Sequence, residues 1–184
     1  MGSGSEDGRM NKQVFMIDLA SCTGCYTCMV ACKDRLNLQD DINVLKVDEE
    51  ESGNYPDIKV VYRPQHCFHC EKPACTEACP VDAISKESDG FVKIDEEECI
   101  GCGECVEACP FDAIYFSDDD LPIKCDGCAD EVGLGWKPVC VRSCPMRALD
   151  YLPLEEVNMQ NRIQDTDFDD KGIGPRIVYL IRKE

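Results

Sequence analysis

The residues best suited to chemistry in this protein are its sixteen cysteines, out of 184 residues in all. They fall into four runs of four, which are Cys22, Cys25, Cys28 and Cys32; Cys67, Cys70, Cys75 and Cys79; Cys99, Cys102, Cys105 and Cys109; and Cys125, Cys128, Cys140 and Cys144. In the third run, three cysteines are spaced two residues apart and a fourth, three residues later, precedes proline. This spacing is typical of a bacterial-type [4Fe-4S] site, in which the fourth cysteine ligates a second cluster.

The third run also shows the physical reason for the spacing. Its first three thiolates can surround one cubane from a tight loop, and Gly101 and Gly103 let the backbone pass close to the inorganic sulfides without a Cβ in the way. Cys109 lies about one helical turn after Cys105, so it points away from that cubane and needs another. Four matched runs therefore predict four [4Fe-4S] clusters, with all sixteen cysteines as iron ligands.

The flanks of the runs repeat as well. A short apolar stretch with an aspartate four residues before the first cysteine, Asp18 or Asp95, precedes the first and third runs. The second, third and fourth runs each end in Cys-Pro-x-x-Ala. The first run breaks this pattern, because Lys33 and not proline follows Cys32. We interpret each run as one unit of strand, cysteine loop, helical turn and second strand. The sequence thus predicts an α+β fold of two bacterial-ferredoxin-like modules.

The order of the runs predicts how these modules are arranged. The two middle runs stand back to back, so residues 64–119 are expected to form one module. The first and last runs lack a contiguous partner, and the simplest solution is an exchange of Cys32 and Cys144 within an outer module, residues 14–63 plus 120–153. Residues 43–62 are predicted to form an inserted β-hairpin, which either covers a cluster or contacts another subunit.

The two ends of the chain carry their own expectations. Residues 1–13 are expected to be a disordered leader or an artificial extension and not a signal peptide. The tail, residues 154–184, contains the apolar run 176–181, a strand that would complete a sheet edge or dock onto a partner. Residues 129–139 are expected to form a loop. No apolar run approaches the roughly 20 residues that a membrane span needs.

Composition separates the iron–sulfur interpretation from its alternatives. The hydrophobic share of 43% includes the cysteines and falls to roughly 34% without them, which is lean for a self-sufficient core. We therefore expect clusters to supply part of the folding energy. A disulfide scaffold would need an oxidising compartment, and zinc sites have no use for the third cysteine and the Cys-Pro after it.

Charge excludes one class of partner. The formal net charge is −18, and four oxidised clusters at about −2 each would bring it near −26, so the surface repels nucleic acid. The acidic blocks are either solvated faces or a docking surface for a basic partner. His66 and His69 flank Cys67 and are expected to form hydrogen bonds rather than to ligate iron. Arg142, Arg147 and Lys137 could tune a potential or contact a partner, and Trp136 is expected to fill the core.

Four motifs resemble one family closely. They are Cys22–Lys33 (CTGCYTCMVACK), His69–Cys75 (HCEKPAC), Lys124–Asp130 (KCDGCAD) and Cys144–Asp150 (CPMRALD). Together they are similar to the iron–sulfur electron-transfer subunits of the dimethyl sulfoxide reductase family of molybdenum and tungsten oxidoreductases. The resemblance covers roughly residues 14–151.

This resemblance implies crossed ligation and a cluster order. Cys22, Cys25 and Cys28 would share a cluster with Cys144; Cys125, Cys128 and Cys140 with Cys32; Cys67, Cys70 and Cys75 with Cys109; and Cys99, Cys102 and Cys105 with Cys79. The first of these clusters would lie nearest the catalytic subunit and the last at the far end. In some relatives tryptophan replaces one cysteine of the third run, whereas Cys102 is present here.

The function implied is electron transfer without catalysis by this chain. A large molybdopterin-containing subunit is the expected partner, together with a membrane anchor or a soluble redox carrier. The alternative is a four-cluster carrier that serves a hydrogenase, a formate dehydrogenase or a carbon monoxide dehydrogenase. A cytoplasmic location is expected, or export bound to a partner that bears the signal.

Overall fold

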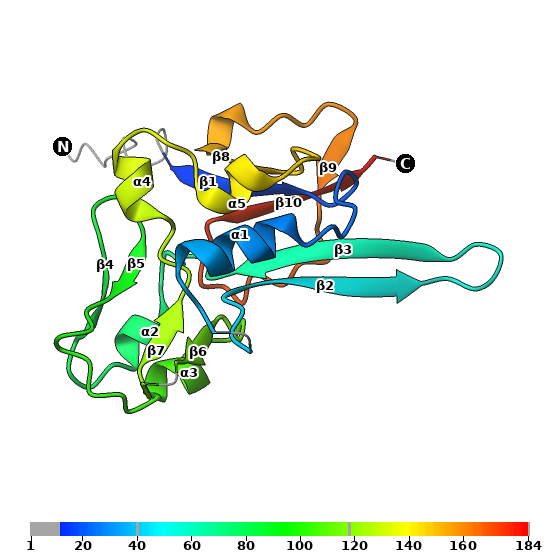
Figure 1. Cartoon of the computed structure of the whole chain (residues 1–184). Coiled ribbons are helices and arrows are strands. Elements are labelled where there is room, and N and C mark those ends of the chain that lie inside the picture. Colours follow the sequence, from blue (N-terminus) through cyan, green and yellow to red (C-terminus); the bar gives the residue numbers. More distant parts are fainter. Residues whose placement is uncertain (1–11, 40, 118, 184) are drawn as a thin grey trace, which may run out of the picture.

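The computed structural model describes residues 12–39, 41–117 and 119–183. Its strands are β1 (Gln13–Asp18), β2 (Leu45–Ser52), β3 (Lys59–His66), β4 (Ile84–Lys86), β5 (Val92–Ile94), β6 (Ile114–Phe116), β7 (Pro122–Lys124), β8 (Leu149–Pro153), β9 (Arg162–Gln164) and β10 (Ile177–Arg182). Its helices are α1 (Thr27–Arg35), α2 (Ala74–Glu77), α3 (Glu104–Ala108), α4 (Ala129–Gly133), α5 (Val139–Ser143) and the 3₁₀ turn η1 (Leu154–Glu156). Figure 1 shows how these short elements are arranged around long connecting loops.

The largest sheet joins the two ends of the chain. Its strand order is β8-β1-β10-β9, with β1 parallel to β10 and antiparallel to β8. Both faces of β10 are covered: Ile177 and Tyr179 belong to the main core, while Val178 and Leu180 pack with Val14 on the other side. A strand that is apolar on both faces is stable inside a sheet.

Two expectations about the chain ends are wrong. The run 176–181 does not complete a sheet edge, because β10 pairs with β1 on one side and with β9 on the other. The leader does not extend to residue 13, because Gln13 begins β1 opposite Pro153 and the ammonium of Lys12 lies 3.0 Å from the carboxylate of Glu71. Residues 1–11 lie outside the described residues.

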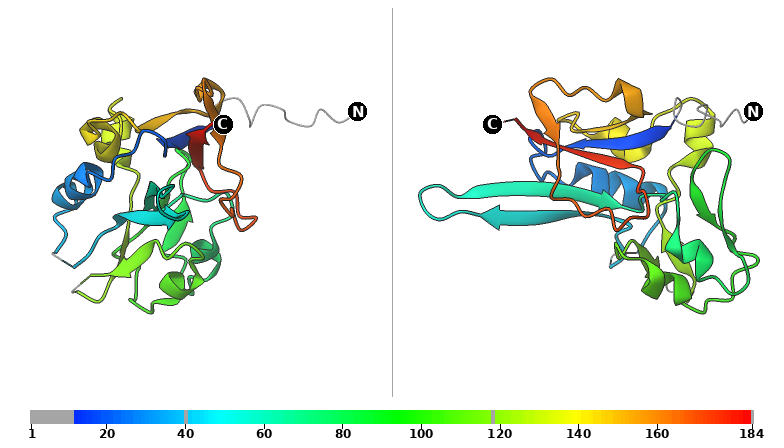
Figure 2. Two further views of the ribbon diagram at one scale, coloured as in Figure 1. Left: turned by 90° about the vertical axis from the view of Figure 1, so that its right-hand side faces the viewer. Right: turned by 180° about the vertical axis from the view of Figure 1, so that it is seen from behind.

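Strands β2 and β3 form an antiparallel ladder from Leu45 opposite His66 to Ser52 opposite Lys59. This ladder extends well beyond the rest of the molecule (Figures 1 and 2). Its inner end is buried, with Leu45 only 2% exposed, whereas Tyr55 in the connecting turn is 90% exposed. The turn requires Gly53, because its φ is +84° and a Cβ there would lie 2.2 Å from the carbonyl oxygen of Asp57.

The middle of the chain repeats one small unit twice. In each unit a cysteine loop leads into a helix of one turn and then into a two-stranded ladder, β4 with β5 and β6 with β7. Helix α2 packs against α3, and these elements lie together as the green part of Figure 1. Outside this part, α1 packs against α5, which brings the first and last cysteine runs together.

Residues 165–174 tie these parts to the main sheet. The ring of Phe168 lies between those of Phe111 and Tyr179, at centroid distances of 6.0 and 5.0 Å. The guanidinium of Arg63 on β3 lies 2.9 Å from the buried carboxylate of Asp165.

The expectation of a loop at 129–139 is wrong for its first five residues, because they form α4.

Candidate iron–sulfur sites

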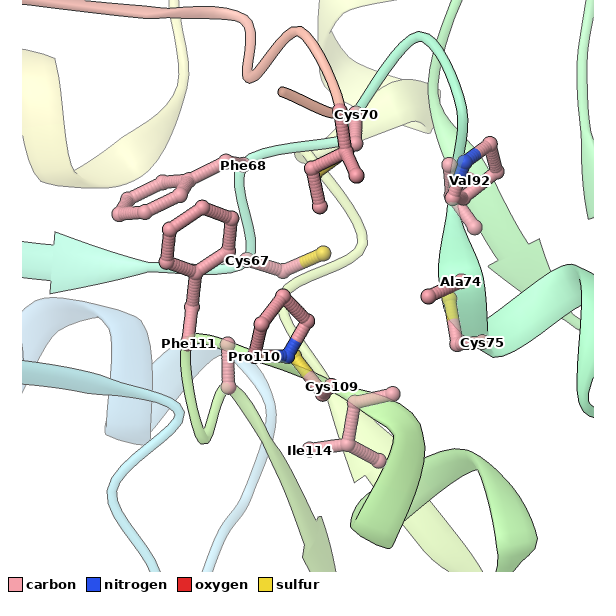
Figure 3. Close-up of a pocket in the computed structure, with 13 residues that line it drawn as sticks. Cys67, Phe68, Cys70, Ala74, Cys75, Val92, Cys109, Pro110, Phe111 and Ile114 are labelled. Carbon is pink, nitrogen blue, oxygen red and sulfur yellow. The ribbon is translucent and has the colours of Figure 1, made fainter. Parts of the chain in front are cut away.

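All sixteen cysteines are free thiols, and the fold gathers them into four sets. The first cavity brings together Cys67, Cys70, Cys75 and Cys109 in about 370 Å³ of empty space (Figure 3). Its remaining walls are mostly apolar and include Phe68, Val92 and Ile114. Three of these thiols come from one run and the fourth ends the next run.

A second cavity repeats this arrangement with residues from opposite ends of the chain. It is lined by Cys22, Cys25, Cys28 and Cys144 and contains about 300 Å³ of empty space. Burial raises the pKa of the Cys28 thiol to about 12, and the neighbouring thiolates of Cys22 and Cys144 add to this effect. Cys25 is exposed, and a hydrogen bond with the hydroxyl of Thr27 lowers its pKa.

The other eight thiols form two further sets by their electrostatic contacts. Burial raises the pKa of Cys32 to about 12, and the charge of Cys128 raises it further; Cys125 and Cys140, which are deeply buried, both lie near Cys32. Burial likewise raises the pKa of Cys105, whose neighbouring thiols are Cys102, Cys99 and Cys79. The family resemblance implies the same four sets, and the assignment of ligands to clusters stays a prediction.

The sets form a row, and we number them along it: the set of Cys22 is the first, that of Cys32 the second, that of Cys67 the third and that of Cys99 the fourth. The charge of Cys28 in the first set reaches Cys32 and Cys140 in the second. Cys125 in the second set lies near Cys67 in the third, and Cys75 in the third lies near Cys105 in the fourth. The only exposed thiols, Cys25 and Cys102, belong to the first and last sets, and all sixteen cysteines lie within the described residues.

Local backbone structure explains why the spacing works. Glycine at the third position of three runs, such as Gly127, has a positive φ that turns the loop, and a Cβ there would lie 2.2 Å from the ring of Phe91. The loop then presents backbone N–H groups to sulfur, as Gly127 does to Cys125 at 3.4 Å. Cys109 and Cys144 stand at the C-terminal ends of α3 and α5, so each faces away from the run that it closes.

The aspartates that precede the first and third runs organise the loop entry. The carboxylate of Asp18 accepts hydrogen bonds from the N–H of Ala20, at 3.1 Å, and the hydroxyl of Ser21, at 2.7 Å. It also pairs with Arg162 at 2.7 Å. Burial alone would raise the pKa of Asp18, but these partners outweigh burial and lower it. Asp95 makes a similar turn by accepting from the N–H groups of Glu97 and Glu98.

The histidines beside the second run are structural. His66 donates from Nδ1 to the carbonyl of Cys67 at 2.7 Å, and His69 accepts at Nδ1 from the N–H of Val92 at 3.0 Å. Burial lowers the pKa of His66 to about 4 and that of His69 well below its usual range, so both are neutral at pH 7. The backbone hydrogen bonds expected for these residues are present.

The basic residues near the last run are mostly paired. Lys137 pairs with Asp150, and Arg142 pairs with Glu131 and lies over the ring of Trp136 at 5.0 Å from its centroid. Trp136 is 59% exposed, so the expectation that it fills the core is wrong. Lys124 opens one of the family motifs, but the motif gave no sign that this lysine is buried, with its ammonium bonded to the carbonyls of Val92 and Cys125.

The donor chemistry fits a [4Fe-4S] cluster in each set. Iron–sulfur cubanes take four thiolates and are stabilised by hydrogen bonds to sulfur and by burial. The sets here contain only thiols, and the two cavities are walled mainly by apolar side chains. Within the described part of the chain, no three His, Cys, Asp or Glu side chains are grouped closely enough to hold a single metal ion. In the two cavities, the thiols surround a volume.

Comparison with known proteins agrees with this chemistry. Residues 58–152 match the model of a family described as "4Fe-4S dicluster domain", and residues 21–83 match a second model with the same description. The B subunit of anaerobic dimethyl sulfoxide reductase from Escherichia coli K12 is 42% identical over 156 residues, which cover 80% of this chain and 76% of that protein. This protein belongs to the same family of iron–sulfur subunits.

Other members of the family extend the comparison. The B subunit of the Haemophilus influenzae anaerobic dimethyl sulfoxide reductase is 42% identical over 158 residues, covering 80% of this chain and 77% of that protein. The formate dehydrogenase iron–sulfur subunit of the same organism is 30% identical over 199 residues, which cover 90% of this chain and 63% of that protein. The predicted [4Fe-4S] cofactor is confirmed, and two dicluster matches correspond to four clusters. Among the described helices, none is long and apolar enough to cross a bilayer.

Proposed function

We propose that this chain is a non-catalytic electron-transfer subunit with four [4Fe-4S] clusters, which passes electrons to or from a molybdopterin subunit containing molybdenum or tungsten. The observation that carries the proposal is the row of four thiol sets with exposed thiols only in the first and last. Each bound cluster would accept or release one electron, at a potential within about −700 to +450 mV. A row with exposed thiols at both ends and buried thiols in the middle suits electrons that enter at one end and leave at the other.

The four sets are proposed as the four ligand groups. The two cavities support this for the sets that contain Cys144 and Cys109. The electrostatic contacts of Cys32 and Cys105 support it for the other two. The crossing is supported for Cys109 and Cys144 by their places at the C-terminal ends of α3 and α5. Cys32 lies within α1, and its electrostatic contacts support the crossing instead. In the two middle sets, seven of the eight thiols are buried, which excludes water from these sulfur atoms and so limits oxidation of the clusters.

The domain division is proposed as an outer module, residues 14–63 plus 120–153, with residues 64–119 inserted between its halves. The pairing of β1 with β8 and the packing of α1 against α5 support the outer module. The packing of α2 against α3 supports the inserted one. Residues 43–62 are proposed as the inserted hairpin.

The two ends of the row are proposed to face different partners. Near Cys25, the exposed side chains of Tyr26 and Val30 would contact the catalytic subunit. Near Cys102, the exposed side chain of Ile100 would contact a membrane anchor or a soluble carrier. The similarity to formate dehydrogenase iron–sulfur subunits favours such an enzyme as the second candidate partner.

Purification of the native assembly without oxygen tests the proposal. We expect about sixteen irons per chain with matching sulfide, and a large partner that contains molybdenum or tungsten. We also expect cluster reduction or oxidation when substrate is added to the complex, measured by electron paramagnetic resonance. Zinc in place of iron, or far fewer irons, would contradict the cluster assignment. A nickel-containing partner would support the alternative carrier.

A further inference from the structure

Lys124 is a buried cation at the end of β7. Its side chain is enclosed, since the residue is only 5% exposed. The ammonium donates hydrogen bonds to the carbonyl of Val92 and, at 3.0 Å, to the carbonyl of Cys125. It therefore bridges β5 of the middle part and the loop that begins the last cysteine run.

No carboxylate in the described residues pairs with this ammonium. Buried charges in proteins are normally paired or bind metal centres, because removal of an ion from water is costly. Two carbonyl dipoles satisfy hydrogen bonds but do not supply a full countercharge. The position of Lys124 therefore requires negative charge from another source.

Cysteine thiols lie near this ammonium, and they become negative when they bind iron as thiolates. Val92, whose carbonyl accepts from Lys124, is itself part of the wall of the cavity that contains Cys67, Cys70, Cys75 and Cys109. Lys124 is in electrostatic contact with Cys75 in that set. An oxidised cubane with four thiolates carries about −2, and a reduced one about −3.

We propose that the Lys124 ammonium is the buried countercharge of the cluster held by Cys67, Cys70, Cys75 and Cys109, and that it raises the reduction potential of this cluster. The proposal rests on the proposed function, because it requires a cluster in that set. A fixed positive charge stabilises the more negative, reduced state more than the oxidised state. Because Lys124 is buried, solvent and salt screen this attraction only weakly. Lys124 is thus a positioning and tuning residue and not an iron ligand.

A second buried cation offers a matched control. Arg176 is 6% exposed, donates to the carbonyls of Gln13, at 2.9 Å, and Asp89, at 3.2 Å, and lies over the ring of Phe91. Its guanidinium contacts backbone oxygens in the same way as Lys124 does. Unlike Lys124, however, Arg176 is not among the main electrostatic partners of Cys70, Cys75 or Cys125. Its removal should disturb packing without changing the field at the third set.

The test is a redox titration of the loaded protein followed by electron paramagnetic resonance. Lys124→Met should lower one midpoint potential so that the reduction equilibrium changes at least tenfold, or about 59 mV for a one-electron couple. Lys124→Arg, which keeps the charge, should lower this midpoint potential much less. Arg176→Met should leave the four potentials within a few-fold of wild type. The affected cluster is identified as the one whose signal Cys109→Ala alters.

Two results would overturn the proposal while the proposed function stands. In the first, Lys124→Met carries its full iron and all four potentials equal those of wild type. In the second, Lys124→Arg lowers the midpoint potential as far as Lys124→Met does, which would show that the charge is irrelevant. If Lys124→Met does not retain its clusters, Lys124→Gln serves as the neutral variant, because its amide can still donate to the Val92 carbonyl. Wild-type protein without iron would instead contradict the proposed function itself.

Discussion

At the scale of single residues, burial determines the state of the thiols before iron is bound. Burial raises the pKa of Cys32 and Cys70 to about 12 and that of Cys75 to about 11. These side chains are therefore protonated at pH 7 in the cluster-free fold. Thiolate is the form that binds iron, so cluster assembly must release these protons. The buried thiols are inert as nucleophiles and become charged only when iron compensates them.

Single cysteine substitutions test the proposed exchange between the first and last runs. Cys144→Ala should alter the same cluster signal as Cys22→Ala, because both thiols line one cavity. Cys32→Ala should alter the signal that Cys140→Ala alters. Each variant should lose at most about four irons, read by iron analysis and electron paramagnetic resonance. A Cys144→Ala variant whose spectrum matches that of Cys140→Ala would show that the fourth ligands do not cross.

The spacing of the cysteines carries most of the information about the site. The helical turn between Cys105 and Cys109 already indicates that they face different clusters, and the structure places them near different thiols. The countercharge was not foreseeable in this way. Lys124 precedes a cysteine in one of the family motifs, and only the folded structure shows that its side chain is buried and bonded to the Val92 carbonyl on β5.

At the scale of elements, the C-terminal strand β10 stabilises the sheet that positions the first set. Tyr179 is 2% exposed, and its hydroxyl donates to the carbonyl of Pro64 at 2.9 Å. Its ring packs on Phe168 and beneath the guanidinium of Arg63, 4.8 Å from the ring centroid. One side chain thus connects β10, β3 and the 165–174 segment.

Truncation of Tyr179 should therefore lower the free energy of unfolding. Tyr179→Phe should cost about 1 kcal/mol, because the buried carbonyl of Pro64 loses its donor. Tyr179→Ala should cost about 3–5 kcal/mol through loss of packing. The control, Tyr55→Ala, removes a side chain that is 90% exposed and should change stability by less than about 0.5 kcal/mol. Urea unfolding of the loaded protein without oxygen measures these values, and equal costs at Tyr179 and Tyr55 would refute a core role for β10.

Local sequence predicted strands better than it predicted their partners. Short apolar runs indicated a strand at 14–17 and another at 176–181, and both exist as β1 and β10. Their parallel pairing joins segments about 160 residues apart in the chain, which no local pattern encodes. The helix α4 was missed because its sequence, ADEVG, is short and ends in glycine, so that tertiary contacts decide its conformation.

At the scale of the whole molecule, the clusters and the core are parts of one structure. Nine of the buried apolar side chains in the described residues are cysteines. The core of the middle part is especially small, since its buried members other than cysteine are Ile84, Val92 and Ile114. The main sheet has the larger aromatic core around Phe15, Phe68 and Tyr179. Dependence on iron should therefore be strongest in the middle part.

Removal of the clusters should unfold most of the chain. A metal site that exists only in the folded state can contribute about 10 kcal/mol or more, as much as the whole stability of many domains, about 5–15 kcal/mol. After chelation of iron without oxygen, we expect gel filtration to show an expanded polypeptide and urea unfolding to lose its cooperative transition. During partial removal, hydrogen exchange should show β4–β7 losing protection before β1 and β10. Restored iron and sulfide should reverse the change, whereas a compact, cooperatively folding protein without iron would show that the apolar core suffices and that the clusters are bound by a preformed scaffold.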